Sequence, residues 1–156
     1  MNKTRTLNRG INNIIGRYSH DQYIVNRNEK VKCTCTEHST SQADVNCPRC
    51  LGTGYKITIR KIQAAAQDTK LPSTSFKGKS LSVTRNFFIP RKYLIQKDDI
   101  IVSYGVPFFV VEIQEMISLE GSLPYNKATT VKKQFDANIF MSNFKNIIAG
   151  KYKWSL

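Results

Sequence analysis

The chain has 156 residues, of which 40% are hydrophobic, and its 24 Lys and Arg against 11 Asp and Glu give a formal net charge of +13. A chain of this length can bury an ordinary core as one domain, or as a small β domain with a metal-held appendage, and no apolar run is long enough to cross a membrane. The excess of positive charge favours an anionic partner, such as nucleic acid or an acidic protein surface.

The first 32 residues are predicted to form a helix followed by an arm. Apolar residues at spacings of three and four predict a helix over residues 5–18, with a face made of Leu7, Ile11, Ile14, Ile15 and Tyr18. Gly10 and Gly16 lower the intrinsic stability of this helix, so we expect it to pack against its own chain or a neighbour. The Tyr-Ile-Val sequence of residues 23–25 then predicts a short strand.

The next segment, residues 33–62, holds all four cysteines in two close pairs, Cys33-Thr-Cys35 and Cys47-Pro-Arg-Cys50. Four thiolates from two loops can fill the tetrahedral positions of one zinc ion. The proline inside the second pair restricts its turn, and the Gly-Thr-Gly sequence that follows lets the chain fold back beside the metal. The pattern predicts a zinc-ribbon-like module in which Cys33, Cys35, Cys47 and Cys50 hold a structural zinc ion.

The spacing of the first pair leaves a second ligand set open. Cys33 and Cys35 are separated by one residue, which is a tight bite for two ligands of one ion, and His38 follows Cys35 at a distance of three residues. Cys35, His38, Cys47 and Cys50 are therefore an alternative set, with Cys33 free. Two disulfides, redox chemistry or four unrelated thiols are further possibilities. We favour structural metal because no apolar signal segment precedes the site, and paired cysteines in a reduced compartment more often bind metal.

A strand and then a loop are predicted after the cysteines. Apolar and polar residues alternate from Tyr55 to Ile62, which is the period of a half-buried strand leaving the metal module. Residues 63–80 are predicted to form a basic, mostly exposed loop, because the sequence from Ala64 to Ser80 is polar and weakly patterned.

Residues 81–156 predict a small antiparallel β-barrel with a C-terminal helix and a basic, aromatic tail. Turn residues separate four expected strands, at residues 81–89, 99–104, 108–119 and 125–135. Asp136 is suited to cap a helix that ends near Gly150. The fold class expected for the whole chain is α+β, mainly β: a small antiparallel barrel with a zinc-ribbon-like module and terminal helices.

The charges are unevenly distributed along the chain. Residues 1–32 and 56–97 are strongly basic, whereas residues 98–120 contain five acids and no Lys or Arg. This pattern predicts an acidic patch beside basic ones, which would suit subunits that meet head to tail in a ring. We find no Ser, His and acid set, no phosphate-binding Gly-Lys loop and no His-rich metal site, and we expect the protein not to be an enzyme.

Three segments carry a resemblance to a known group of proteins. They are Phe-Phe-Ile-Pro at residues 87–90, Ile-Gln-Lys-Asp-Asp-Ile-Ile at 95–101 and Tyr-Gly-Val-Pro-Phe-Phe-Val-Val-Glu-Ile at 104–113. Their order of strand, acidic turn, glycine hairpin and apolar return resembles the central β region of tailed-bacteriophage head-closure proteins. Some proteins of that group are also similar in having a Cys-Pro-x-Cys-x-Gly-Thr-Gly insertion before the barrel, here residues 47–54, so the resemblance covers about residues 33–135.

The resemblance implies a virion structural protein of the head–tail connector, or neck, assembled in the host cytoplasm. Copies would form a ring below the portal, help to retain packaged DNA and dock tail or neck proteins, with secondary and non-specific DNA contact. The alternative function, of a different class, is a zinc-ribbon nucleic-acid-binding or regulatory protein that grips phosphates with its ribbon and its basic 56–97 stretch.

Overall fold

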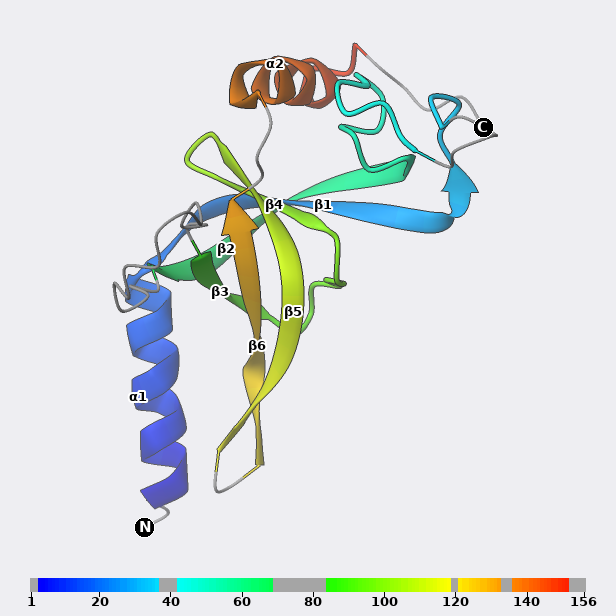
Figure 1. Ribbon diagram of the computed structural model, residues 1–156. Helices are drawn as coiled ribbons and strands as arrows, with labels where there is room; N and C mark the ends of the chain where they lie inside the picture. Colours follow the sequence, from blue (N-terminus) through cyan, green and yellow to red (C-terminus); the bar gives the residue numbers. More distant parts are fainter. Residues whose placement is uncertain (1–2, 37–41, 69–83, 119–120, 133–135, 152–156) are drawn as a thin grey trace, which may run out of the picture.

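The computed structural model describes residues 3–36, 42–68, 84–118, 121–132 and 136–151. Six antiparallel strands close into a barrel in the order β1-β2-β3-β6-β5-β4 (Figure 1). The strands are β1 (Ser19–Lys32), β2 (Tyr55–Asp68), β3 (Thr84–Pro90), β4 (Ile100–Ser103), β5 (Val106–Ser118) and β6 (Gly121–Lys132). With helices α1 (Lys3–Arg17) and α2 (Ala137–Ile148), this confirms the predicted class of a mainly β, antiparallel barrel with terminal helices.

The first strand closes the barrel. β1 pairs with β2 along most of its length and with β4 through Tyr23, Ile24 and Val25. The barrel predicted within residues 81–156 is therefore incomplete, because two of its six strands come from before that segment. A short local pattern at residues 23–25 could not show this, since pairing with β2 extends β1 to 14 residues.

Residues 63–68 were expected in a loop and instead form the end of β2. Ala65 and Ala66 pair with Phe88 and Phe87 of β3, and Ala64 and Ala65 are buried. Alanine is a weak strand former, and here its pairing with an aromatic strand decides the local structure. The rest of the predicted basic loop, residues 69–80, lies outside the described residues.

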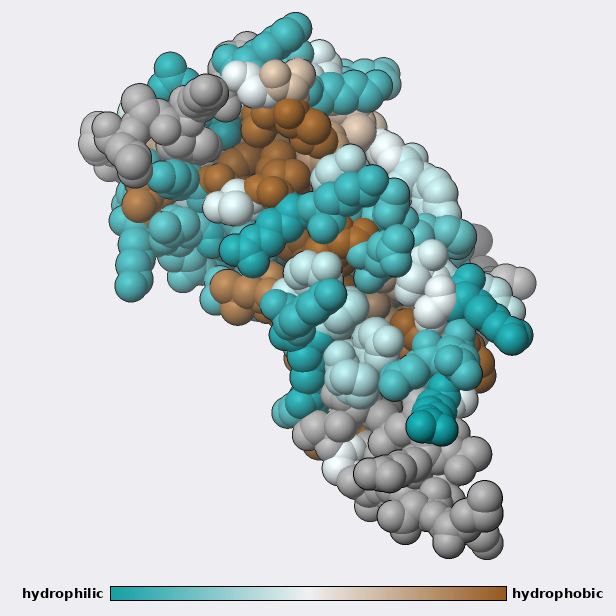
Figure 2. All heavy atoms as spheres, turned by 180° about the vertical axis from the view of Figure 1, so that it is seen from behind, coloured by the Kyte–Doolittle hydropathy of each residue, from teal (hydrophilic) through white to brown (hydrophobic). Residues whose placement is uncertain are grey.

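Two hydrophobic clusters hold the fold. One fills the barrel and contains Ile24, Ile62, Phe87, Ile101 and Phe108 among others. The other lies between the outer face of the barrel and α2, because successive residues of a strand point to opposite faces. It contains Val25, Leu51, Ile57, Ile100, Val102, Phe140 and Phe144. Seen from behind, hydrophobic side chains gather just below α2 (Figure 2).

The predicted turn and cap of the second half are present. Tyr104 and Gly105 both have positive φ, 48° and 75°, in the two-residue turn that joins β4 and β5. Asp136 caps α2, since its Oδ1 accepts hydrogen bonds from the backbone N–H groups of Asn138 and Ile139. Phe140 and Phe144, one turn apart, are buried against the barrel and anchor this helix.

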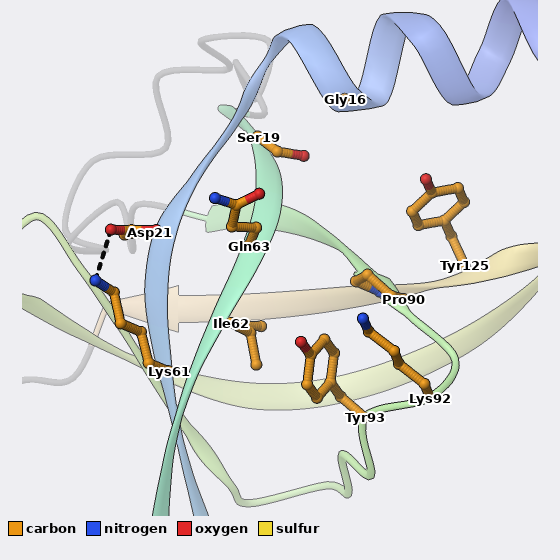
Figure 3. Close-up of a pocket in the computed structure, with 10 residues that line it drawn as sticks. All are labelled: Gly16, Ser19, Asp21, Lys61, Ile62, Gln63, Pro90, Lys92, Tyr93 and Tyr125. Atoms are coloured by element: carbon orange, nitrogen blue, oxygen red, sulfur yellow. Dashed lines mark ion pairs between the residues drawn. The ribbon is translucent and has the colours of Figure 1, made fainter.

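α1 confirms the predicted N-terminal helix and points away from the barrel (Figure 1). Ile14 and Tyr18 are 59% and 65% exposed. A cavity of about 430 Å³ opens where the end of α1 meets β2 and the loop after β3, and Gly16, Gln63, Pro90 and Tyr93 are among its lining residues (Figure 3). In the described part of the chain, neither helix combines the length and hydrophobicity needed to cross a bilayer.

Candidate metal centre

The four cysteines meet at the end of the arm that β1 and β2 form beyond the barrel (Figure 1). Their Sγ atoms all lie within 4.8 Å of one another. The Sγ atoms of Cys33 and Cys47 are 3.9 Å apart, and those of Cys35 and Cys50 are 3.5 Å apart. The two pairs therefore converge as the sequence predicted, with one thiol of each pair facing one thiol of the other.

The loop after Cys50 folds back because three residues adopt positive φ. These are Leu51, Gly52 and Gly54, at 53°, 78° and 76°. A Cβ atom on Gly52 would lie 2.7 Å from the Val45 carbonyl oxygen, so this position needs glycine for space as well as for conformation. The turn also brings the Gly54 N–H to within 3.4 Å of the Cys50 Sγ atom, which accepts its hydrogen bond.

Burial and hydrogen bonding together set the pKa values of the thiols in the cysteine cluster. Cys33, Cys47 and Cys50 are buried, and Cys35 is half-buried. Burial raises the pKa of Cys35 to about 11 and raises the pKa of Cys50 further. Burial acts the same way on Cys47, but hydrogen bonds from the backbone N–H groups of Cys50 and Arg49 outweigh it and lower the pKa of Cys47. A bound cation would displace the protons that Cys35 and Cys50 hold at neutral pH.

The spacing of the sulfur atoms suits a tetrahedral ion. A Zn–S distance of about 2.3 Å places two thiolates of a tetrahedral site about 3.8 Å apart, and the separations of 3.5 and 3.9 Å bracket that value. The four cysteines are free thiols rather than disulfides. Four protein ligands would leave no open position for substrate, so the arrangement suits a structural ion better than a catalytic one.

The two ligand sets stay predictions. Cys33 lies within the cluster, as the four-cysteine set requires. His38, the alternative ligand, falls outside the described residues.

The cysteine loop is also attached to α2, which the sequence did not predict. Leu51, next to Cys50, is 1% exposed and belongs to the same hydrophobic cluster as Phe140 and Phe144 of the helix. The Asn143 Nδ2 atom donates a hydrogen bond of 3.1 Å to the Asn46 carbonyl oxygen in the loop. The metal centre therefore shares a packed interface with the C-terminal helix. An apolar residue directly after the last cysteine was the one local signal of this contact.

The acidic stretch is partly paired with basic residues of the same chain. Asp98 pairs with Arg27 at 3.1 Å, and Glu115 pairs with Arg91 at 2.5 Å. Asp99 is fully buried. Two of the five acids of residues 98–120 are thus paired with arginines of the chain and a third is buried, whereas Glu112 is exposed, so the acidic patch stays a prediction.

Asp99 connects the loop before β4 to β1 through hydrogen bonds. Its carboxylate accepts hydrogen bonds from the backbone N–H groups of Arg27 and Gln96, at 3.0 and 2.8 Å, and from Asn26 Nδ2 at 2.8 Å. Burial raises the pKa of Asp99, and these hydrogen bonds counteract only part of that effect. The carboxylate therefore links β1 to the loop before β4.

No protein-family model matches the chain, and a search of curated proteins found no significant match.

Proposed function

We propose that this chain is a structural protein of the head–tail connector of a tailed bacteriophage, a head-closure subunit that assembles as a ring below the portal. The observation that carries the proposal is the position of α1. This helix leaves the barrel with Ile14 and Tyr18 exposed, and a cavity lies between its end and the strands (Figure 3). Apolar side chains at helical spacing that find little cover on their own chain are typical of a surface that another protein covers.

The arrangement of the barrel adds support from the resemblance. Residues 87–90 lie in β3, the acidic turn at residues 98–99 directly precedes β4, and Gly105 forms the hairpin that leads into β5. These segments thus occupy three strands of one barrel in the order that the resemblance implies. Because Asp98 and Glu115 are paired within the chain and Asp99 is buried, the apolar face of α1 supports assembly better than charge complementarity between copies does.

The proposal includes a structural zinc ion bound by Cys33, Cys35, Cys47 and Cys50. Zinc fits four thiolates at these separations, and softness of the ligands favours it over Mg²⁺ or Ca²⁺. The proposed partners are the portal ring, tail or neck proteins and further copies of the chain, with the virion neck as location. Elemental analysis of the purified protein tests the metal: we expect about one zinc per chain, and metal-free protein with disulfide-bonded cysteines would refute the site.

Assembly is tested by mixing the purified chain with portal rings and recording ring-bound copies by sedimentation and electron microscopy. We expect the wild type to associate and Ile14→Asp to lose association, because a charge on the apolar face of α1 would be buried at the contact. Asn13→Asp introduces the same charge at an exposed position about 100° around the helix from Ile14, outside the apolar face, and should leave association intact. A monomer in the absence of portal agrees with the proposal, since assembly is expected on the partner ring.

The alternative, a zinc-ribbon regulator that binds nucleic acid, is favoured by the exposed basic residues of the arm, including Lys30 and Arg60. A regulator combines phosphate contacts with base contacts and therefore distinguishes DNA sequences. Sub-micromolar, sequence-selective binding to duplex DNA at physiological salt, together with no association with portal rings, would replace the connector proposal with this one.

A further inference from the structure

We propose that one face of the β1–β2 arm binds the backbone of duplex DNA. The inference gives the DNA contact of the proposed connector a location, and rests on that function for its biological setting. The register of the two strands defines the face. Asn26 pairs with Thr58, and Asn28 pairs with Lys56. Paired residues of an antiparallel ladder point to the same side, so these side chains share one face with Arg60, two residues beyond Thr58.

The opposite face of the arm is already covered. Val25 and Ile57 belong to the cluster that packs beneath α2, and Tyr23 and Ile59 pack against it. The Tyr23 ring meets Phe144 edge to face, with centroids 5.3 Å apart. Since α2 and the cysteine loop lie over this apolar face, a ligand can approach the ribbon from the polar face.

The polar face is hollow. A cavity of about 380 Å³ lies on it, and its lining includes Asn28, Lys30, Thr58, Arg60 and Gln96. Asn26 fixes the wall of this groove, because its Nδ2 atom donates hydrogen bonds to the Leu94 carbonyl oxygen at 2.9 Å and to Asp99 at 2.8 Å. The wall is therefore tied to the barrel, and the groove is part of the folded structure.

The chemistry of the groove suits phosphates. Lys30 and Arg60 are exposed, and Lys56 lies on the same face four residues from Arg60, which is about 13 Å along a strand. Glu29 also lines the groove, but it forms an ion pair with Arg27 at 2.6 Å. Asn28, Thr58 and Gln96 add neutral polar groups of the kind that bond phosphate and sugar oxygens.

Duplex DNA fits this groove better than an acidic peptide does. Peptide recognition relies on apolar pockets that hold side chains, whereas the residues that line this groove are of polar or charged types apart from Leu94, which is 60% exposed. Separated cations favour binding to the phosphate backbone, which is independent of sequence and strongly dependent on salt.

The test measures fluorescence anisotropy of a labelled DNA duplex with the full-length protein over a series of salt concentrations. The variant Lys30→Gln/Arg60→Gln removes two charges from the groove, and Lys92→Gln/Lys145→Gln removes two exposed charges elsewhere. We expect the groove variant to bind about tenfold more weakly. The slope of log K against log salt should become shallower, with its magnitude smaller by about two. The control variant should change affinity by less than about threefold. Metal content and circular dichroism verify that both variants are folded.

Two outcomes would overturn the inference. Equal loss in both variants would mean that DNA responds to net charge and not to the groove. Tighter binding of a polyglutamate peptide than of DNA, lost in the groove variant, would assign the groove to an acidic protein. The ring test is independent, because Ile14→Asp lies outside the arm and should retain DNA binding. A failure of ring association would therefore not contradict DNA binding at the groove. Likewise, a failure of DNA binding at the groove would not contradict ring association.

Discussion

Leu51→Ala should loosen the metal centre and α2 together. Leu51 follows Cys50 directly, is 1% exposed and packs in one cluster with Phe140 and Phe144. Replacing a fully buried leucine by alanine costs about 2–5 kcal/mol, since the cavity that remains adds to the lost transfer free energy. The backbone is little affected, because leucine and alanine have similar difficulty at the positive φ of 53° found here.

The size of the effect on α2 follows from how the helix is held. A 12-residue helix is marginal in isolation, so its stability depends on packing. A loss of about 3 kcal/mol in the shared cluster corresponds to about a 100-fold increase in opening. We therefore expect amide hydrogen exchange in residues 137–148 to accelerate by about two orders of magnitude. Zinc transfer to a coloured chelator should also become faster, because the loop that carries Cys50 loses its anchor.

Leu94→Ala is the matched control, since it makes the same change at a side chain that is 60% exposed. We expect it to alter exchange in α2 and zinc transfer by less than about 0.5 kcal/mol. If Leu51→Ala accelerates zinc transfer while α2 keeps its wild-type protection, the metal loop and the helix are not coupled, and the reasoning from their shared cluster is refuted.

Cys33→Ser and His38→Ala separate the two ligand sets: we expect zinc content to fall in the first and persist in the second, and the reverse result would establish the histidine-containing set. Asp99→Asn should lower the free energy of unfolding by about 1–3 kcal/mol in urea denaturation, because an amide nitrogen cannot accept the N–H donors that surround this carboxylate. The pKa of Asp99 is raised in the folded state, so its contribution to stability decreases as pH rises from 3.8 through that raised value. Asp99→Asn should lack this decrease, and identical pH profiles would contradict the assignment. Zinc affinity should weaken as pH falls, because the metal competes with protons for thiols such as Cys35, whose pKa is about 11 without metal. Competition with a chelator at several pH values measures this, and an affinity independent of pH would argue against thiolate ligands.

Local patterns were sufficient for much of the secondary structure. The helical spacing from Leu7 to Tyr18 specified α1, and Asp136 specified the start of α2, because both signals act within one or two turns of chain. The turn at Gly105 also follows from local conformation. The four cysteines converge for a similar reason: the two short cysteine loops close at the end of one strand pair.

Tertiary structure decided what depends on segments meeting across the chain. Residues 23–25 and 100–102 pair to close the barrel although neither contains a signal for the other, and Ala65 joins the sheet because Phe88 lies opposite it. The same holds for charge. Asp98 appeared in sequence as part of an acidic surface, and folding placed it beside Arg27. The spacing of apolar residues in the sequence indicates which face of a helix or strand is apolar. Which other element covers that face depends on the packing of the whole chain. For that reason Leu51, one apolar residue in a polar loop, showed its contact with α2 only in the folded protein.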